Sequence, residues 1–146
     1  MIEGLRRIPL AILGDHRGAV LPMLRADRPP FERFGEIYFS LVRAGQVKGW
    51  NLHRRVTCNL AVVAGAVRFL FVDGRGESGS RCAVVEERLS RDDYALLVVP
   101  PGLWMCFGAL GAEDGLIANC ATEPHDPAEL ERRALDDPQM PRWSAR

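Results

Sequence analysis

The chain has 146 residues, its 19 Lys and Arg balance 19 Asp and Glu, and 47% of its residues are hydrophobic. This length and apolar content suit one ordinary domain with its own core, so we expect a single domain over residues 1–146. A net charge of zero without runs of like charge gives no reason to expect nucleic acid or an anionic membrane as a partner.

Short apolar runs follow one another along the chain and are separated by turn residues. The run 36–43 (EIYFSLVR) alternates, and so does 66–73 (AVRFLFVD), whose residues 67, 69 and 71 share one face. The remaining runs, continuous or nearly so, are 59–65, 94–99, 103–110 and 115–121. Gly, Pro and charged residues fill the breaks at the spacing typical of an all-β sandwich or barrel.

Only the segment 126–137 (DPAELERRALDD) favours a helix. Asp126 can cap its first turn, Pro127 suits the position that follows, and Leu130 and Ala134 are four residues apart. We therefore predict an all-β, single-domain cupin, a double-stranded β-helix or jelly-roll barrel, with a short C-terminal helix.

The four cysteines are isolated in the sequence, with no C-x-x-C pair. This pattern fits the reduced thiols of a cytoplasmic protein better than a disulfide or zinc framework. No secretory cleavage pattern or membrane-spanning run follows the short apolar stretch at 8–13, so we expect a cytoplasmic location.

The segment 48–60 (KGWNLHRRVTCNL) contains His53, which is a core residue, a metal ligand or a catalytic base. A metal-binding cupin has two histidines and a glutamate in this segment, and one more histidine after a P-x-G turn. Here Arg55 takes the second histidine position, no carboxylate follows within the segment, and Met105 follows the Pro-Pro-Gly turn. One histidine cannot hold a catalytic ion, so we predict no metal and no cofactor.

A cupin barrel without metal ligands still encloses a cavity, and six segments fit one family of such proteins. They are 14–21 (GDHRGAVL), 48–53 (KGWNLH), 71–79 (FVDGRGESG), 89–107 (LSRDDYALLVVPPGLWMCF), 122–127 (TEPHDP) and 135–143 (LDDPQMPRW). In their order and spacing the chain resembles the dTDP-4-dehydrorhamnose 3,5-epimerase family, in particular its short bacterial relatives. The resemblance covers nearly the whole chain. It implies an isomerase acting on a nucleotide-linked 4-keto-6-deoxyhexose, and a homodimer formed near the N-terminus.

Enzymes of that family remove a proton from the carbon beside the 4-keto group and return it on the other face. This chemistry needs a base and a hydrogen-bond donor for the enolate oxygen. By family position the base is His53, and its carboxylate partner is Asp137, with the adjacent Asp136 as the alternative.

The resemblance breaks down at the acid, because Asn119 stands where full 3,5-epimerases have a tyrosine. An amide cannot supply the proton, although it can donate a hydrogen bond to the enolate oxygen. Epimerisation at a single carbon (C3 or C5), a ketoisomerisation, or a loss of catalysis would each fit this change. His125 and Tyr94 are substitute acids to consider, against ordinary roles in a turn and in packing.

Substrate-binding candidates also follow from the resemblance. Arg17 matches the D-x-R-G arginine that holds the diphosphate, for which a forked guanidinium is well suited. Arg55 can add charge, and Trp50 can stack on a base or sugar or belong to the core. We expect Met105 to line the cavity and His125 to contact the ligand.

Two functional classes therefore remain open. One is an epimerase or isomerase in which His53, Asp137 and Asn119 are catalytic. The other is a catalytically degenerate cupin that binds a sugar nucleotide or a partner protein without chemistry. The changes at Asn119 and Met105 weaken the first class, whereas His53 and Asp137 support it.

Overall fold

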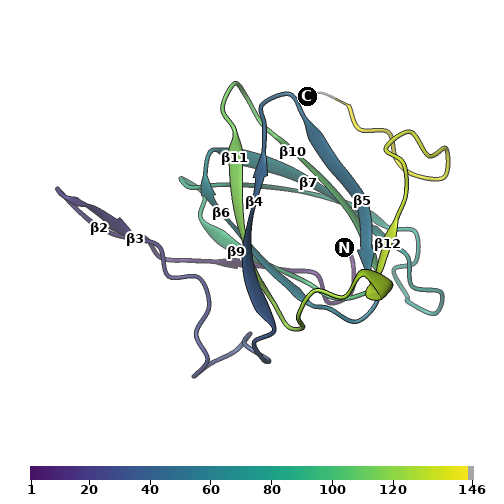
Figure 1. Ribbon diagram of the computed structural model, residues 1–146, viewed down its shortest axis with the longest axis horizontal. Helices are drawn as coiled ribbons and strands as arrows, with labels where there is room; N and C mark the ends of the chain where they lie inside the picture. Colours follow the sequence, from purple (N-terminus) through teal and green to yellow (C-terminus); the bar gives the residue numbers. More distant parts are fainter. Residues whose placement is uncertain (145–146) are drawn as a thin grey trace.

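The computed structural model describes residues 1–144. Two five-stranded antiparallel sheets face each other (Figure 1). The first sheet has the order β1 (Arg6–Pro9), β9 (Ala95–Val99), β6 (Cys58–Ala64), β11 (Gly115–Ala121), β4 (Glu36–Val42). The second has the order β12 (Leu130–Arg132), β5 (Val47–His53), β10 (Leu103–Ala109), β7 (Ala66–Asp73), β8 (Val84–Ser90). The all-β prediction is confirmed.

The core lies between the two sheets and is built from the alternation of their strands. On β7 the side chains of Val67, Phe69 and Phe71 are fully buried, as the sequence pattern predicted, and Phe69 lies against Phe107 of β10 with ring centroids 5.7 Å apart. The intervening residue Leu70 points to the other face of the sheet, where it joins a second apolar cluster. The C-terminal segment packs over that cluster.

Five strands were not predicted from the sequence, and each of them is short or lies at a sheet edge. They are β1, β8, β12, and the hairpin of β2 (Leu13–Asp15) and β3 (Gly18–Val20). Charged residues interrupt the apolar pattern of β8, which lies at a sheet edge and pairs only with β7. An edge strand tolerates such a sequence, which explains why periodicity did not reveal it.

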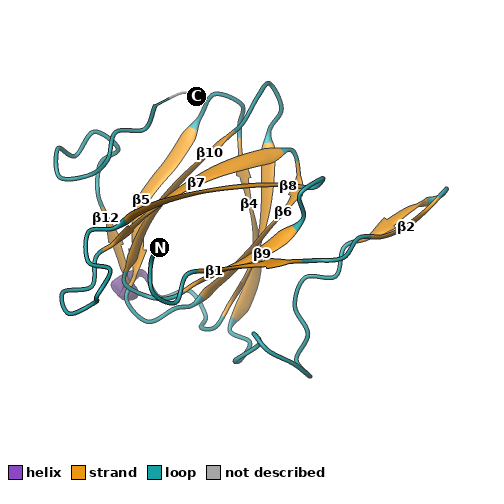
Figure 2. Cartoon of the chain, turned by 180° about the vertical axis from the view of Figure 1, so that it is seen from behind, coloured by secondary structure: helices purple, strands orange, loops and turns teal. Residues whose placement is uncertain are grey.

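The predicted C-terminal helix was wrong. The structure has one 3₁₀ turn, η1 (Pro127–Glu129), capped by Asp126 as the sequence suggested (Figure 2). At Leu130 the backbone becomes extended and forms β12, which pairs with β5. A segment of 12 residues gains little from an isolated helix, whereas pairing satisfies the open edge of β5. Among residues 1–144, no helix is long and apolar enough to cross a bilayer.

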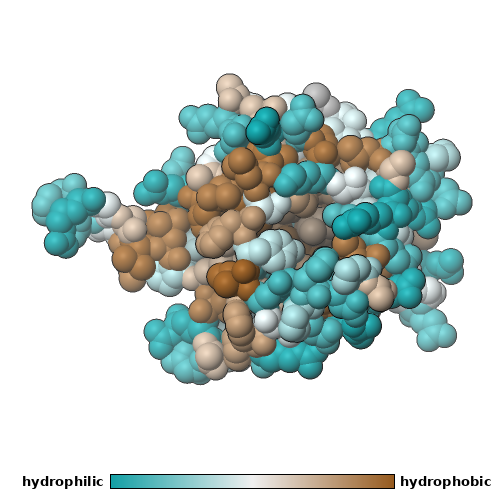
Figure 3. Space-filling view, viewed as in Figure 1, coloured by the Kyte–Doolittle hydropathy of each residue, from teal (hydrophilic) through white to brown (hydrophobic). Residues whose placement is uncertain are grey.

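Apolar side chains remain uncovered on two neighbouring parts of the surface. The β2–β3 hairpin projects away from the two sheets and exposes Leu13 and Val20 (Figure 1). The outward face of β4, an edge strand of the first sheet, exposes Ile37, Phe39 and Leu41. Brown apolar surface is visible on this side of the molecule in Figure 3.

Candidate functional site

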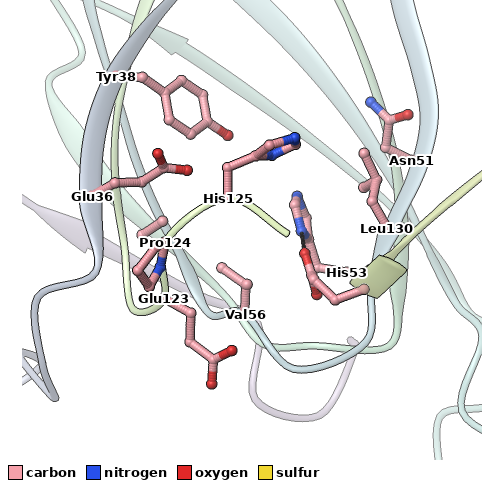
Figure 4. A pocket seen from close by; sticks show the side chains of 11 residues that line it. Glu36, Tyr38, Asn51, His53, Val56, Glu123, Pro124, His125 and Leu130 are labelled. Atoms are coloured by element: carbon pink, nitrogen blue, oxygen red, sulfur yellow. Dashed lines mark hydrogen bonds and ion pairs between the residues drawn. The ribbon is translucent and has the colours of Figure 1, made fainter. Parts of the chain in front are cut away.

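A cavity of about 380 Å³ opens between the two sheets, close to η1. Its walls come from β4, β5, the end of β11 and the loop that leads into η1. Figure 4 shows His53 of β5 on one side, Tyr38 of β4 on the other, and His125 between them in the view. Glu36 and Glu123 add carboxylates, and Val56 and Leu130 add apolar surface.

The imidazole of His53 is held by Glu129. Its Nδ1 is hydrogen-bonded to Glu129 Oε1, and because a carboxylate only accepts, Nδ1–H is the donor. The other carboxylate oxygen accepts the backbone N–H groups of Arg54 at 3.0 Å and Arg55 at 3.2 Å. With Nδ1 occupied, Nε2 carries the lone pair that can accept a proton from a ligand in the cavity.

The β12 pairing positions this dyad. Leu130 lies opposite His53 in the register, so the preceding residue, Glu129, is brought under the histidine. The Glu129 side chain is only 3% exposed. Although burial favours its protonated form, the hydrogen bonds from His53 and from the Arg55 and Arg54 backbone hold the pKa of Glu129 below its ordinary value.

The same contacts favour the protonated form of His53. Burial opposes a charged imidazole, but the Cys58 sulfur and the Glu129 carboxylate outweigh it and raise the pKa of His53 to about 9. At pH 7 about one molecule in a hundred then has the neutral imidazole that can act as a base. The fraction of molecules in which His53 can act as a base therefore increases as the pH rises toward 9.

Asn119 does not reach the cavity. It is fully buried, its Oδ1 accepts the backbone N–H of Asn59 at 3.1 Å, and its Nδ2 donates to the Tyr38 hydroxyl at 2.8 Å. Both ends of the amide are thus engaged. The prediction that Asn119 contacts an enolate oxygen is not supported, and Tyr38 is the residue of this pair that lines the cavity.

Asp137 is not the partner of His53. It accepts the backbone N–H of Gln139 at 2.8 Å and faces Arg133 at 3.5 Å. Asp136 and Asp137 line a different cavity, on the side covered by the C-terminal segment. The prediction failed because β12 and the turn after it carry these residues past the outer face of the second sheet.

The other predicted binding residues divide into three groups. Trp50 and Met105 are buried and do not line the cavity, which agrees with the core alternative for Trp50 and speaks against the expected cavity position of Met105. Arg17 lies at the tip of the β2–β3 hairpin, paired with Asp15 in a separate shallow pocket. His125 lines the cavity, and Arg55, which does not line it, pairs with Glu123 of the cavity wall and with Asp126.

Comparison with known proteins places this geometry in a family. No family model matches the chain. The dTDP sugar isomerase of Desulfovibrio desulfuricans G20 has a crystal structure that is 40% identical, covers 96% of this chain and 90% of its own, and superposes with a TM-score of 0.93. This chain belongs to the family of dTDP-sugar isomerases and dTDP-4-dehydrorhamnose 3,5-epimerases.

Two further relatives agree with this assignment. RmlC of Legionella pneumophila Philadelphia 1, a dTDP-6-deoxy-D-glucose-3,5-epimerase solved with dTDP-4-keto-L-rhamnose, is 26% identical with a TM-score of 0.84, over 95% of this chain and 77% of its own. The spore coat polysaccharide biosynthesis protein SpsL of Bacillus subtilis (strain 168) is 22% identical over 92% of this chain and 89% of its own. The sugar isomerase resemblance and the cupin-like all-β fold are thus confirmed.

Sequence reasoning missed two residues of this family member's site. Glu129 was placed inside an expected helix, and only the pairing of β12 reveals that it meets His53. Tyr38 could have been grouped with Glu36 from the alternation that predicted a strand at 36–43, because the two residues share one face of that strand. Both line the cavity. The sequence did not indicate which face turns toward the ligand.

Proposed function

We propose that this protein epimerises or isomerises a nucleotide-linked 4-keto-6-deoxyhexose by abstracting a proton from one carbon beside the ketone, C3 or C5. The observation that carries the proposal is the His53–Glu129 dyad, whose Nε2 faces a cavity lined by polar and apolar groups. A histidine that a carboxylate orients is a competent base for such a carbon acid.

The chemistry is a proton transfer to the imidazole. Nε2 of neutral His53 takes the proton, the electrons of the C–H bond move into the carbonyl, and an enolate forms. The imidazolium is stabilised by Glu129, which is already ionised. Returning a proton to the same carbon on its other face completes an epimerisation. If the proton came from C3, returning one to C4 while the proton of the 3-hydroxyl moves to O4 completes a ketoisomerisation. Neither step needs a metal or an organic cofactor.

We assign the binding of the diphosphate to arginines at the cavity rim. Arg55 pairs with Glu123 at 3.4 Å and with Asp126 at 3.0 Å, and Arg33 pairs with Glu123 at 2.5 Å. These pairs are exposed, and exposed pairs contribute only about 0–1 kcal/mol. A diphosphate entering the cavity can therefore replace a carboxylate partner at low cost and form bidentate contacts.

We also propose a homodimer in which the projecting hairpin of one copy covers the outward face of β4 of the other. Both surfaces are apolar, through Leu13 and Val20 on the hairpin and Ile37, Phe39 and Leu41 on β4. An edge strand with such a face needs a cover in water. In that arrangement Arg17, at the hairpin tip of one copy, binds the diphosphate in the cavity of the other copy.

The dimer is tested by light scattering after size-exclusion chromatography. Phe39→Glu on the β4 face is expected to give a monomer. Val84→Glu is the matched control, because Val84 is also an exposed apolar residue (52% against 61% for Phe39) but lies on β8 of the other sheet. A monomeric wild-type protein, or a Phe39→Glu variant that remains dimeric, would contradict the arrangement.

The free thiols Cys58, Cys82, Cys106 and Cys120 support our proposal of a cytoplasmic location.

The activity is tested by solvent exchange. The protein is incubated in D2O with dTDP-, CDP- and GDP-linked 4-keto-6-deoxyhexoses, and the C3 and C5 protons are followed by NMR. We expect exchange at one carbon in wild type, its loss in His53→Ala, and no change in Arg91→Ala, where an exposed residue of the turn after β8 is replaced. Binding without exchange for all three sugars would instead favour the alternative, a sugar-nucleotide-binding cupin without chemistry.

A further inference from the structure

Tyr38 and Asn119 form a pair across two neighbouring strands. In the register of β4 and β11 the two residues lie directly opposite each other, and both point between the sheets. Asn119 is 1% exposed, whereas Tyr38 is 40% exposed and lines the cavity. The pair thus has a buried member that cannot touch a ligand and an accessible member that can.

The direction of their hydrogen bond follows from the buried network. The backbone N–H of Asn59 lies 3.1 Å from one end of the Asn119 amide, so that end must be the acceptor Oδ1. The other end is therefore the N–H₂ group, 2.8 Å from the Tyr38 oxygen. The phenol accepts this bond, and its own proton stays free for a partner in the cavity.

The phenol and the imidazole come from opposite walls of the cavity. Tyr38 is carried by β4 of the first sheet and His53 by β5 of the second. Figure 4 shows both side chains directed toward the space between them. A sugar ring bound there has one face toward the base and the other toward a neutral O–H donor.

We propose that Tyr38 is the catalytic acid that protonates the second face of the enolate, held in place by the positioning residue Asn119. This rests on the proposed function and deepens it, because it selects epimerisation. His53 takes the proton from one face. The electron pair of the enolate then forms a new C–H bond with the Tyr38 proton on the other face, which leaves a tyrosinate. Solvent returns a proton to the tyrosinate and takes one from the imidazolium, so the cycle closes without a co-reactant.

The environment supports a neutral donor that can bear a transient charge. Burial, with the nearby Cys58, raises the pKa of Tyr38 although the Asn119 hydrogen bond lowers it, so the phenol stays protonated through the range in which His53 is titrated. The Asn119 N–H group then points at the oxygen on which negative charge develops, as expected of a preorganised donor.

A ketoisomerisation makes a different demand on the site. There a base on one face can move the proton between adjacent carbons and needs no acid opposite. His125 also lines the cavity, but it is exposed on the loop before η1, whereas Tyr38 is fixed by a strand and by Asn119. The placement therefore favours Tyr38 as the acid.

The test separates proton exchange from inversion. Wild type, Tyr38→Phe, His125→Gln and the control Tyr94→Phe are incubated with the substrate in D2O. NMR measures deuterium incorporation with retained configuration and the formation of the inverted sugar. Tyr94 is a suitable control because its hydroxyl donates to the Leu21 carbonyl at 3.2 Å, away from the cavity.

We expect Tyr38→Phe to lower inversion by about 10²-fold or more, the usual contribution of a general acid, while exchange at His53 continues. That continued exchange also reports an intact fold. Asn119→Asp, whose carboxylate would accept the Tyr38 proton, is expected to lower the ratio of inversion to exchange, which a general loss of stability does not change. Tyr94→Phe should leave both rates unchanged.

Three results would overturn the assignment of Tyr38 while leaving the proposed function intact. They are inversion at the wild-type rate in Tyr38→Phe, loss of inversion in His125→Gln instead, and a wild-type enzyme that exchanges deuterium without inverting. Absence of exchange in the wild type would instead refute the proposed function itself.

Discussion

Replacing Glu129 by Gln should disable His53 without removing it. The backbone N–H groups of Arg54 and Arg55 both point at Glu129 Oε2, so the single oxygen of the new amide must face them. The amide N–H₂ group then faces His53 Nδ1. Because two donors cannot share a bond, Nδ1 must become the acceptor, and the imidazole proton moves to Nε2, where it blocks the base.

The magnitude of the effect follows from the raised pKa of His53. The difference between its ordinary value of 6.5 and about 9, at about 1.4 kcal/mol per pH unit, corresponds to about 3–4 kcal/mol of stability shared by Glu129 and Cys58. A raised pKa stabilises the folded state fully below pH 6.5, and the contribution is lost as the pH rises to about 9. The stability lost in Glu129→Gln should therefore be largest at weakly acidic pH up to 6.5, where Glu129 is still ionised, and should shrink toward pH 9.

Two measurements check this reasoning. Imidazole NMR should give a His53 pKa near 9 in the wild type and a value lower by about one pH unit or more in Glu129→Gln, with the proton on Nε2. Exchange at the substrate carbon should fall by about 10³-fold or more. Glu131→Gln is the matched control, since Glu131 bonds to the exposed Arg54 side chain. An unchanged His53 pKa in Glu129→Gln would refute the argument.

Three further predictions concern other parts of the molecule. Asp73→Asn should destabilise the protein by about 2–4 kcal/mol, because the buried carboxylate accepts bonds from Arg75 and two serines. Since these bonds lower its pKa, the wild-type advantage in urea unfolding should begin to decline as the pH falls below 3.8 and should decrease further as the pH is lowered. Phe69→Ala should cost about 3–5 kcal/mol in thermal unfolding, and a loss under 1 kcal/mol would contradict its place in the core. Arg55→Ala should raise KM severalfold in steady-state kinetics with little change in kcat, and an unchanged KM would exclude it from binding.

Much of the fold was accessible from the sequence because buried strands carry a strong signal. The runs at 66–73 and 94–99 became β7 and β9. Edge strands carry a weak signal, since only one side is paired. The segment after Asp126 has a helical pattern, yet it forms an edge strand, because its pairing with β5 outweighs local propensity.

The site was accessible only in part, for a related reason. His53 and His125, the two histidines that the sequence pointed to, both line the cavity, and each lies near a recognisable motif. The partner of His53 depends on the register of β12 against β5, a long-range pairing that periodicity does not encode. Trp50 has the residue type of a stacking platform, but the alternation of β5 turns it to the outer cluster.

The central claim is that His53 abstracts a proton from one carbon beside the ketone. The most direct test uses two substrates, one deuterated at C3 and the other at C5, in ordinary water. We expect the wild-type protein to replace the deuterium of one of them with a solvent proton, and His53→Ala to replace neither. Loss of label at the wild-type rate in His53→Ala, or retention of label at both carbons in the wild type, would contradict it.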